Sequence, residues 1–495
     1  MRLLLTIFVF SFFGAVFIGC DSGGSGGGGF VPTGDILAVA ERAGQNQTIK
    51  VGGTEGAVPP GSTVSVTNLS TSETQNTVGL ADGSFDPTFT GNTNDMFNVL
   101  VTNNGNVVID IEIGVTLLRN AVERDLAQLG SVPADIQIRG SRAYVINGFS
   151  NNIQIFELNQ NPPQLLFKIV VPPDSNPISM DFFGDNQAYV ANNTGQSVAV
   201  VNISNGDCET LIVSAEDQGT TIPCQNVINV PSNTFEEPAG VLIVNDKVYI
   251  SNNNLDENFS SNGNGFITVL STATHQVLDT IAATGSNTTS MVEIDEILYV
   301  LNNGNILFDF ETSEFTCDTN FPPSIDIIDT LDDSVFDTID IPLSQQNPTV
   351  CLPNNLTATS DGFGYTGLGL VGALLKVDLF EGTVINGPAN PILITDLAAL
   401  NNTADIVIKD NLLFTSLFNS DQIAVLDTSS DEIDPFPYIT PFPAGIRGDD
   451  PNSQLFDGVQ SLAIRPGDNF TGADLYFITG ISEQLGSVDT TLQTQ

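Results

Sequence analysis

Short runs of alternating apolar and polar residues, separated by turn residues, make up almost the whole chain. Between residues 31 and 115 these runs include STVSVTNLS and FNVLVTNNGNVVIDIEIGV, and Asp82-Gly83 is a hairpin signal. Alternation with period two is typical of strands that bury one face. The pattern therefore predicts an all-β chain that begins with a small β-sandwich over residues 31–115.

From residue 116 onward one pattern recurs seven times: an aromatic-centred apolar strand, a polar turn and a second apolar strand. Two copies read AYVINGFSNNIQIFEL and AYVANNTGQSVAVVNI. The aromatic residues are Tyr144, Tyr189, Tyr249, Tyr299, Tyr365, Phe414 and Tyr476. Most copies have another apolar run before this core, and many have one after it. Four short strands per repeat predict a seven-bladed β-propeller over residues 116–495, with the aromatic residues packed between blades.

Two short motifs resemble those of a known repeat family. They are YVAN at Tyr189 and YVLN at Tyr299, with V-x-V-x-D/N downstream. They resemble the YVTN family of β-propeller repeats, which occurs in surface-layer and exported bacterial proteins. The resemblance covers residues 130–490 and departs from the motif in the fifth repeat (GYTGLGL) and the seventh (LYFITG). The stretch from GAVPPGSTVSV onward resembles bacterial immunoglobulin-like domains, which implies a spacer or adhesion module.

The last repeat ends with QLGSVDT and then only TLQTQ, so a fourth strand is missing at the C-terminus. The segment 116–130 precedes the first repeat and is placed to supply that strand. We therefore expect this segment to pair beside Leu485–Asp489 and close the ring.

The N-terminus reads MRLLLTIFVFSFFGAVFIGC. One charge, Arg2, precedes an uncharged apolar run that is shorter than the ~20 residues of a membrane span, which is typical of a secretory signal. Gly19-Cys20 resembles the lipobox of bacterial lipoproteins, which implies a signal peptide over 1–19 and a lipid on Cys20. Residues 20–30 then form a glycine-rich tether. An ordinary signal peptide with a chance cysteine, or an N-terminal membrane helix, is the alternative.

The charge balance excludes one class of partner. Lys plus Arg number 13 against 58 Asp plus Glu, a net charge of -45. Nucleic acid is therefore excluded, because binding to phosphates requires basic clusters. The predicted partners are the membrane, through the lipid, and an envelope protein or glycan. The location is extracytoplasmic, at the outer membrane and cell surface or the periplasmic face of the inner membrane.

Four cysteines remain after Cys20, an even number that favours disulfides in an exported protein and allows three pairings. We expect Cys208–Cys224 through a hairpin of a third and a fourth strand. We expect Cys317–Cys351 because both loops should open on one face of the propeller. The spacing of these cysteines fits no zinc pattern and His275 is the only histidine, so a structural zinc site is improbable. His275 lies in a turn and is expected to be solvent-exposed.

Carboxylates in the long insertions are the candidate metal ligands, because oxygen ligands suit Ca²⁺. None of these clusters has the spacing of an EF-hand loop. The candidates are Asp256, Asp309, Asp449, Asp450 and Asp457. Apart from calcium, no cofactor is expected.

The sequence favours a lipid-anchored envelope protein that displays the propeller as a binding or scaffold module. No GxSxG, P-loop or dinucleotide fingerprint occurs in a supporting context, and there is no tryptophan. The alternative is a calcium-dependent hydrolase of the lactonase-like propeller kind. Convergent carboxylate and amide side chains at the channel would favour the enzyme, whereas a binding module needs only an open rim.

The longest insertions are expected on one face of the propeller, where loops commonly carry function. They are 251–265, 303–323 and 440–458. The aromatic residues of the first two insertions would either form an exposed surface or pack down over the blade edges or into the channel. These residues are Phe259, Phe308, Phe310, Phe315 and Phe321.

Overall fold

The computed structural model describes residues 30, 32–40, 45–117, 122–214, 223–255, 261–309, 314–344, 350–395, 401–433, 441–449, 453, 455–466 and 474–488. The predicted signal peptide and Cys20 lie outside these residues. Within them the regular structure is almost entirely strand, apart from the 3-10 turn η1 (Phe418–Ser420) and the one-turn helix α1 (Ile446–Asp449). No helix in this part of the chain is long and apolar enough to cross a membrane. The all-β class is therefore confirmed.

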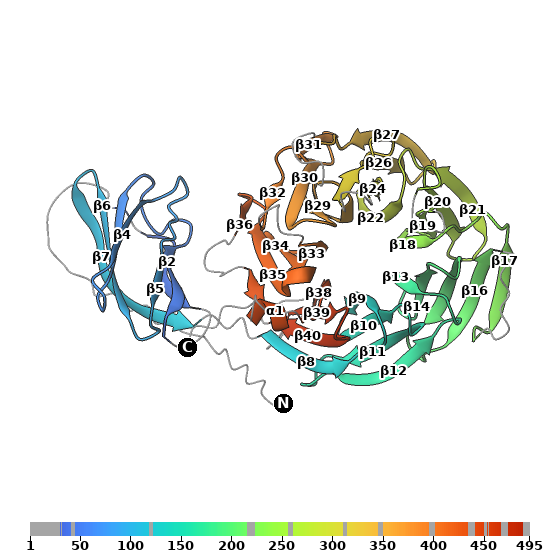
Figure 1. The fold of residues 1–495 in the computed structure, drawn as a ribbon, viewed down its shortest axis with the longest axis horizontal. Coiled ribbons are helices and arrows are strands. Elements are labelled where there is room, and N and C mark those ends of the chain that lie inside the picture. The colour runs from blue at the N-terminus through green and yellow to red at the C-terminus, as the bar shows by residue number, and fades with distance from the viewer. Residues whose placement is uncertain are drawn as a thin grey trace, which may run out of the picture.

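Seven strands form the first unit, drawn in blue to cyan in Figure 1. They are β1 (Ile36–Ala40), β2 (Gln47–Gly53), β3 (Thr63–Asn68), β4 (Thr74–Val78), β5 (Thr88–Gly91), β6 (Met96–Asn103) and β7 (Asn106–Leu117). The order is β4-β3-β6-β7-β1-β2-β5, and the long β7 pairs with β6 antiparallel and with β1 parallel. Alternate residues from both ends of this order share one core, including Ile49, Val64 and Phe97.

The remaining strands form seven blades around a ring (Figure 1). Blade 1 contains β9 (Pro133–Arg139), β10 (Arg142–Asn147), β11 (Asn152–Glu157) and β12 (Gln164–Val170). Blade 2 contains β13 (Pro177–Phe183), β14 (Gln187–Asn192), β15 (Ser197–Asn202), β16 (Cys208–Ser214) and β17 (Asn226–Val230). Blade 3 contains β18 (Pro238–Val244), β19 (Lys247–Asn252), β20 (Phe266–Ser271) and β21 (Val277–Ala282).

Blade 4 contains β22 (Thr288–Ile294), β23 (Ile297–Asn302), β26 (Ser324–Asp329) and β27 (Ser334–Asp340), with an inserted hairpin of β24 (Ile306–Asp309) and β25 (Glu314–Cys317). Blade 5 contains β28 (Pro353–Ala358), β29 (Phe363–Leu368), β30 (Ala373–Asp378), β31 (Thr383–Asn386) and β32 (Ile392–Leu393). Blade 6 contains β33 (Thr403–Lys409), β34 (Leu412–Leu417), β35 (Gln422–Asp427), β36 (Glu432–Ile433) and β37 (Phe442–Pro443).

Blade 7 closes the ring with strands from both ends of the propeller sequence. It contains β38 (Val459–Ile464), β39 (Leu475–Thr479), β40 (Gln484–Val488) and β8 (Val122–Gln128). β8 pairs antiparallel with β40, and Ala127 lies opposite Leu485. This confirms that the segment before the first repeat supplies the missing strand. Closure covers a sheet edge that would otherwise be open to solvent.

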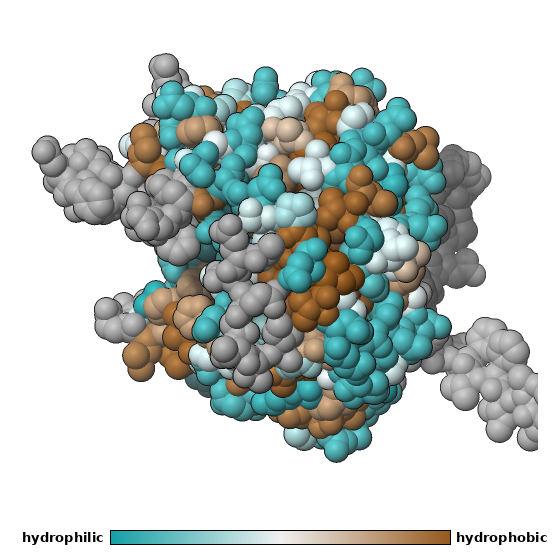
Figure 2. All heavy atoms as spheres, turned by 90° about the vertical axis from the view of Figure 1, so that its right-hand side faces the viewer, coloured by the Kyte–Doolittle hydropathy of each residue, from teal (hydrophilic) through white to brown (hydrophobic). Residues whose placement is uncertain are grey.

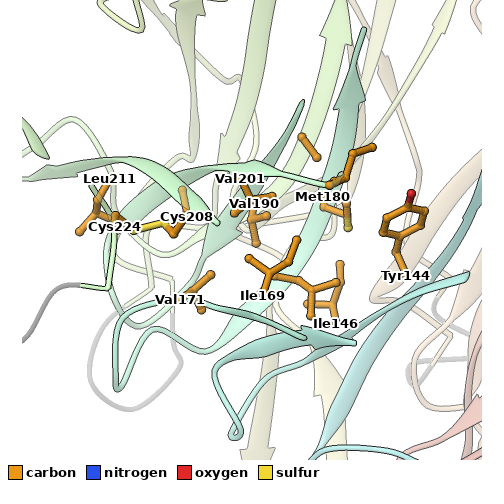
Figure 3. Packing of buried hydrophobic residues seen from close by; sticks show 14 of the residues in the cluster. Tyr144, Ile146, Ile169, Val171, Met180, Val190, Val201, Cys208, Leu211 and Cys224 are labelled. Atoms are coloured by element: carbon orange, nitrogen blue, oxygen red, sulfur yellow. A yellow bond between two sulfur atoms is a disulfide. The ribbon is translucent and has the colours of Figure 1, made fainter. Parts of the chain in front are cut away.

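The repeated aromatic residues lie on the second strand of each blade and are buried. These strands show nearly unbroken burial because a neighbouring blade covers each face of the sheet, whereas the outer strands alternate or are largely exposed. Figure 3 shows one such core between blades 1 and 2, which extends from Tyr144 and Met180 to the Cys208–Cys224 disulfide. The predicted packing of the aromatic residues between blades is thus confirmed.

Both predicted disulfides are present. Cys208 and Cys224 have Cα atoms 4.4 Å apart, and Cys317 and Cys351 have Cα atoms 6.0 Å apart. The expected hairpin is wrong, however. Cys208 begins the fourth strand, β16, and Cys224 precedes a fifth strand, β17, that pairs with β16 in parallel. Two disulfides indicate an oxidising, extracytoplasmic environment.

The propeller has two unequal faces. The loops between second and third strands and the segments that lead into the next blade form one face, which we call the upper face. The lower face carries the other turns, which are short: residues 140–141 join β9 to β10, and 245–246 join β18 to β19. One exception on the lower face is 465–474 in blade 7. The three long insertions, 251–265, 303–323 and 440–458, all belong to the upper face.

Candidate functional site

The first strands of the seven blades line a central channel with a cavity of about 560 Å³. The third residue of each first strand faces this channel, and because six of these seven residues have polar side chains we call them the polar ring. The ring consists of Asp135, Ser179, Gly240, Ser290, Asn355, Asp405 and Ser461. In three blades this side chain accepts a hydrogen bond from the backbone of the next blade: Val241 N to Ser179 Oγ, Leu356 N to Ser290 Oγ and Leu462 N to Asp405 Oδ2. The polar ring therefore ties neighbouring inner strands together.

Asp405 is the most heavily hydrogen-bonded member of the polar ring. Its Oδ1 accepts from Asn355 Nδ2 at 2.5 Å and from the Ile406 backbone at 2.8 Å. Its Oδ2 accepts from Ser461 Oγ at 2.6 Å and from the Leu462 backbone at 2.8 Å. Burial raises the pKa of Asp405, and these four donors oppose that rise. A carboxylate with four donors is held as an acceptor between blades 5, 6 and 7.

Asp135 faces Asp405 across Ser461 and has fewer donors. Ser461 Oγ lies 3.1 Å from Asp135 Oδ1, and Gln137 Nε2 donates to Asp135 Oδ2 at 3.2 Å. Burial, and next the charge of Asp405, raise the pKa of Asp135 to about 7. Ser461 has one hydroxyl proton, and its shorter contact is with Asp405. The contact with Asp135 is therefore best satisfied when Asp135 carries a proton and donates it to Ser461 Oγ.

Sequence reasoning did not single out these channel residues. Asp135 and Asp405 each stand inside an apolar strand, and their alternation was interpreted only as a strand pattern. The available signal was the same tripeptide, Ala-Asp-Ile, at 134–136 and 404–406 in the first strands of two blades. A charged residue repeated at one position of a buried strand points to a shared environment.

Second-strand tyrosines reach the following blade through their hydroxyl groups. Tyr249 Oη donates to Asp333 Oδ1 at 2.6 Å, and Tyr365 Oη donates to Asp431 Oδ1 at 3.0 Å. Lys247 and Lys376 pair with the same two carboxylates, each at 2.7 Å. Three of the few lysines thus join blades, because Lys409 also pairs with Asp474 of blade 7.

His275 takes the place of the carboxylate in blade 3. It holds the position in the turn between third and fourth strands that Asp333 holds in blade 4 and Asp431 in blade 6. All three residues have a left-handed φ: 58° at His275, 50° at Asp333 and 57° at Asp431. Its Nδ1 is 2.9 Å from Tyr189 Oη, and burial lowers its pKa, so a neutral ring can accept the tyrosine proton. The prediction of a solvent-exposed histidine is wrong, because the side chain is half-buried against blade 2.

The asparagine that ends the YVAN-type motif is a structural residue. Asn147, Asn192, Asn252 and Asn302 end the second strands of blades 1 to 4 and are fully buried. Asn147 Oδ1 accepts from the Gly130 backbone, and Asn252 Oδ1 accepts from the Glu236 backbone. In blades 1 and 3 the side chain therefore holds the segment that enters the blade, whereas Asn302 Oδ1 of blade 4 accepts from Thr288 Oγ1 of the first strand.

The predicted calcium ligands do not come together in the described residues. Asp256 and Asp450 lie outside them, and the structure describes only the backbone of Asp309 and Asp449. Asp457 Oδ2 accepts from the Ile446 backbone at 2.8 Å, so this carboxylate oxygen organises its own loop. Across the described part of the chain, no group of three or more His, Cys, Asp or Glu side chains is arranged to hold a metal ion.

The insertion before blade 7 is built around Asp421, a buried residue of the loop between β34 and β35. Its carboxylate accepts from the backbone N–H groups of Gly458 at 2.7 Å, Asp457 at 2.9 Å and Arg447 at 3.0 Å. The fixed loop presents Leu455, which is 71% exposed, and Ile446 is exposed as well. This part of the upper face is thus a rigid platform with apolar side chains in solvent.

The other long insertions are described in part. Phe259 and Phe310 lie outside the described residues, and only the backbone is described for Phe308 and Phe315. Phe321 is half-buried. The Cys317–Cys351 disulfide joins the β24–β25 hairpin to the segment entering blade 5, so these two parts of the upper face are fixed to each other. The exposed aromatic surface stays a prediction.

Apolar side chains also occur on the outer wall of the ring. Figure 2 shows a patch of them among polar residues on the wall that lies on the β17 and β21 side of Figure 1. Val227 of β17 and Leu278 of β21 are among the exposed apolar residues of the outer strands. Scattered apolar exposure is normal for a folded protein, so this wall by itself indicates no site.

No protein-family model matches the chain. No curated protein matches it either. Among solved structures it is similar to hydrazine synthase of Kuenenia stuttgartiensis, with 14% identity over 74% of this chain and 97% of that chain and a TM-score of 0.52. It is also similar to a streptogramin B lyase (13% identity, 74% and 97% covered, TM-score 0.50) and to virginiamycin B lyase from Staphylococcus aureus (11%, 74% and 98%, 0.50). At such identities the likeness shows the fold alone: residues 122–488 form a seven-bladed β-propeller.

Proposed function

We propose that this chain is an exported lipoprotein whose propeller serves as a binding or scaffold module at the cell envelope. The lipobox-like Gly19-Cys20 and the glycine tether support a lipid anchor, and the two disulfides fit an oxidising compartment. The YVTN-like repeats and the immunoglobulin-like stretch support the same class of exported protein. The partner is an envelope protein or glycan.

One observation carries the proposal: the long loops lie on the upper face, whereas the polar side chains of the channel are hydrogen-bonded between blades. A propeller that holds a partner on its rim needs rigid loops with exposed contact groups. The Asp421-centred platform and the loop fixed by Cys317–Cys351 meet that need. Exposed apolar groups on this face include Phe149, Leu455 and Ile481.

A hydrolase in the channel is the second candidate, because carboxylate and amide side chains do converge there. Asp135, Asp405 and Asn355 belong to one polar ring, and Asp135 has a pKa near neutrality, which suits a general acid or base. Hydrolysis of a lactone by the purified chain, with and without added calcium, tests this candidate. Activity that disappears in Asp135→Asn would favour the enzyme over the binding module.

The binding proposal is tested by capture from envelope extract with the mature chain on beads. We expect Leu455→Asp combined with Ile481→Asp to abolish capture, because both side chains are exposed on the upper face. Leu331→Asp combined with Phe380→Asp is the matched control, since these residues are exposed on lower-face turns. Equal loss in both variants, or loss only in the control, would refute the upper face as the binding surface.

The lipid anchor is tested separately. Wild-type protein should incorporate labelled palmitate and fractionate with membranes, whereas Cys20→Ser should do neither. Membrane association that persists unchanged in Cys20→Ser would refute lipidation.

A further inference from the structure

A second cavity, of about 340 Å³, opens on the upper face between blades 1 and 2. Three segments line it: the loop between β10 and β11, the segment that enters blade 2, and the loop between β14 and β15. The lining residues are Gly148, Phe149, Asn151, Asp174, Asn176 and Thr194. The cavity shares no lining residue with the central channel or the Asp421-centred platform, and its volume is within the range of small-ligand sites.

The walls of this cavity are fixed by hydrogen bonds. The Gly148 backbone donates to Val132 O at 2.9 Å, and the Asn176 backbone donates to Asn151 Oδ1 at 3.0 Å. On the opposite side Thr194 Oγ1 donates to Asp174 O at 2.6 Å. A ligand that enters therefore finds its contacts already in place, which lowers the entropy lost on binding.

Three side chains are left to face a ligand. Phe149 is 68% exposed at the tip of its loop. Among the described residues, no protein group hydrogen-bonds to the Asp174 carboxylate or the Asn176 amide. A Cβ at Gly148 would lie 2.5 Å from Asn176 Oδ1, so the glycine makes room for that amide beside the aromatic ring.

This combination has the chemistry of a saccharide site. The negative face of an aromatic ring attracts the polarised C–H groups on one face of a pyranose. A carboxylate offers only acceptors and an amide offers both donors and acceptors, so together they satisfy neighbouring hydroxyl groups. With Asp174 in the cavity and a net charge of -45 on the chain, an anionic sugar is repelled.

We propose that this cavity binds one residue of a neutral glycan, with Phe149 as the stacking platform and Asp174 and Asn176 as the hydroxyl partners. The inference rests on the proposed binding function and names its ligand class and subsite. Its test uses other residues than the test of the proposed function, because Leu455 and Ile481 are not part of the cavity.

The test uses the mature full chain and saturation-transfer NMR, followed by calorimetry, with chitotriose, maltotriose, cellotriose and mannotriose as probes and trigalacturonate as the anionic comparison. We expect at least one neutral trisaccharide to bind and trigalacturonate not to bind. Phe149→Ala and Asn176→Ala should each weaken binding by about tenfold or more. Phe336→Ala is the matched control, because Phe336 is 60% exposed on the outer strand β27.

The inference is overturned if none of the neutral probes binds, if trigalacturonate binds as tightly, or if Phe149→Ala binds like the wild type. Unchanged thermal melts of Phe149→Ala and Phe336→Ala verify that both variants are folded. Envelope capture that depends on Leu455 and Ile481 while no saccharide binds would refute this inference and leave the proposed function standing.

Discussion

Asp135 lies where blades 1, 6 and 7 meet at the channel, and its protonation is linked to the stability of the fold. Its pKa is raised from 3.8 to about 7, so folding favours the neutral form. The stability gained from this proton is complete below the ordinary pKa of a carboxyl and is lost as the pH rises through 7. The shift corresponds to at most roughly 4 kcal/mol, reduced by water in the channel, because Asp135 is only partly buried by area.

Asp135→Asn should therefore be more stable than the wild type above pH 7, and the difference should vanish near pH 4. Asparagine keeps the neutral shape and can donate to Ser461 Oγ. The measurement is the free energy of unfolding in urea between pH 4 and pH 8, with Asp332→Asn at an exposed turn as the control. An equal pH dependence in wild type and Asp135→Asn would contradict the shared-proton interpretation.

The tyrosine contacts between blades differ in the charge of their partners. Tyr249 donates to the carboxylate of Asp333, whereas Tyr189 meets the neutral ring of His275. Hydrogen bonds to charged groups contribute about 1.5–3 kcal/mol, against about 1 for neutral pairs. Tyr249→Phe should then lower the free energy of unfolding by about 2 kcal/mol, and Tyr189→Phe by about 1 kcal/mol.

Equilibrium denaturation of the two variants measures this difference. Tyr299→Phe is the control, since the equivalent turn of blade 5 has Gly382 in place of a carboxylate. A larger loss in Tyr189→Phe than in Tyr249→Phe would contradict the assignment of His275 as a neutral acceptor.

At the scale of elements, the repeated strand pattern predicted the positions of strands better than the loop sequences predicted the positions of sites. The recurring aromatic residue located every second strand, because burial on both sheet faces demands an apolar strand there. The short C-terminal repeat located the closing strand β8 for a similar reason: an unpaired edge needs a partner. The sequence could not distinguish an antiparallel hairpin from the parallel pairing of β16 and β17, because either arrangement brings Cys208 and Cys224 together.

The candidate sites were less predictable, for physical reasons. The acidic residues of the insertions were predicted as metal ligands, and of these five only Asp457 has a described side chain, which accepts a backbone hydrogen bond. Asp135 and Asp405 lie in apolar strands. One polar position in a seven-residue strand does not change the alternation of apolar and polar residues, so the pattern gave no reason to select them. His275 looked like an exposed turn residue, because the tyrosine that covers it belongs to the previous blade.

The fifth strand of blade 2 offers a test at this scale. β17 pairs with β16 along one edge and is tied to it by Cys208–Cys224, a link across 16 residues. Replacing both cysteines with serine should lower the stability of this strand by about 3 kcal/mol, the loop-closure contribution expected for a loop of that length. Hydrogen exchange should then accelerate at 226–230, while β14 and β15 stay protected.

The Cys317→Ser, Cys351→Ser double variant is the comparison, because its disulfide lies on the upper face of blade 4. It should leave exchange in β17 unchanged. If residues 226–230 stay protected from hydrogen exchange when Cys208 and Cys224 are both replaced by serine, backbone pairing alone holds the strand.

At the scale of the whole molecule, the two faces of the propeller carry different groups. Ion pairs at third-to-fourth-strand turns, such as Lys247–Asp333 and Lys376–Asp431, join blades near the lower face. The upper face carries the long insertions, one disulfide and the two apolar or aromatic surfaces around Leu455 and Phe149. The tether and the first unit separate the predicted lipid anchor from the propeller in the sequence.

Photo-crosslinking in intact cells tests the upper face as the binding surface most directly. A photoreactive amino acid at position 455 on the upper face is compared with one at position 331 on the lower face, which is similarly exposed (71% and 75% for the native leucines). The account predicts a discrete crosslinked product from position 455, and none from position 331. A product from position 331 alone, or the same product from both positions, would contradict it.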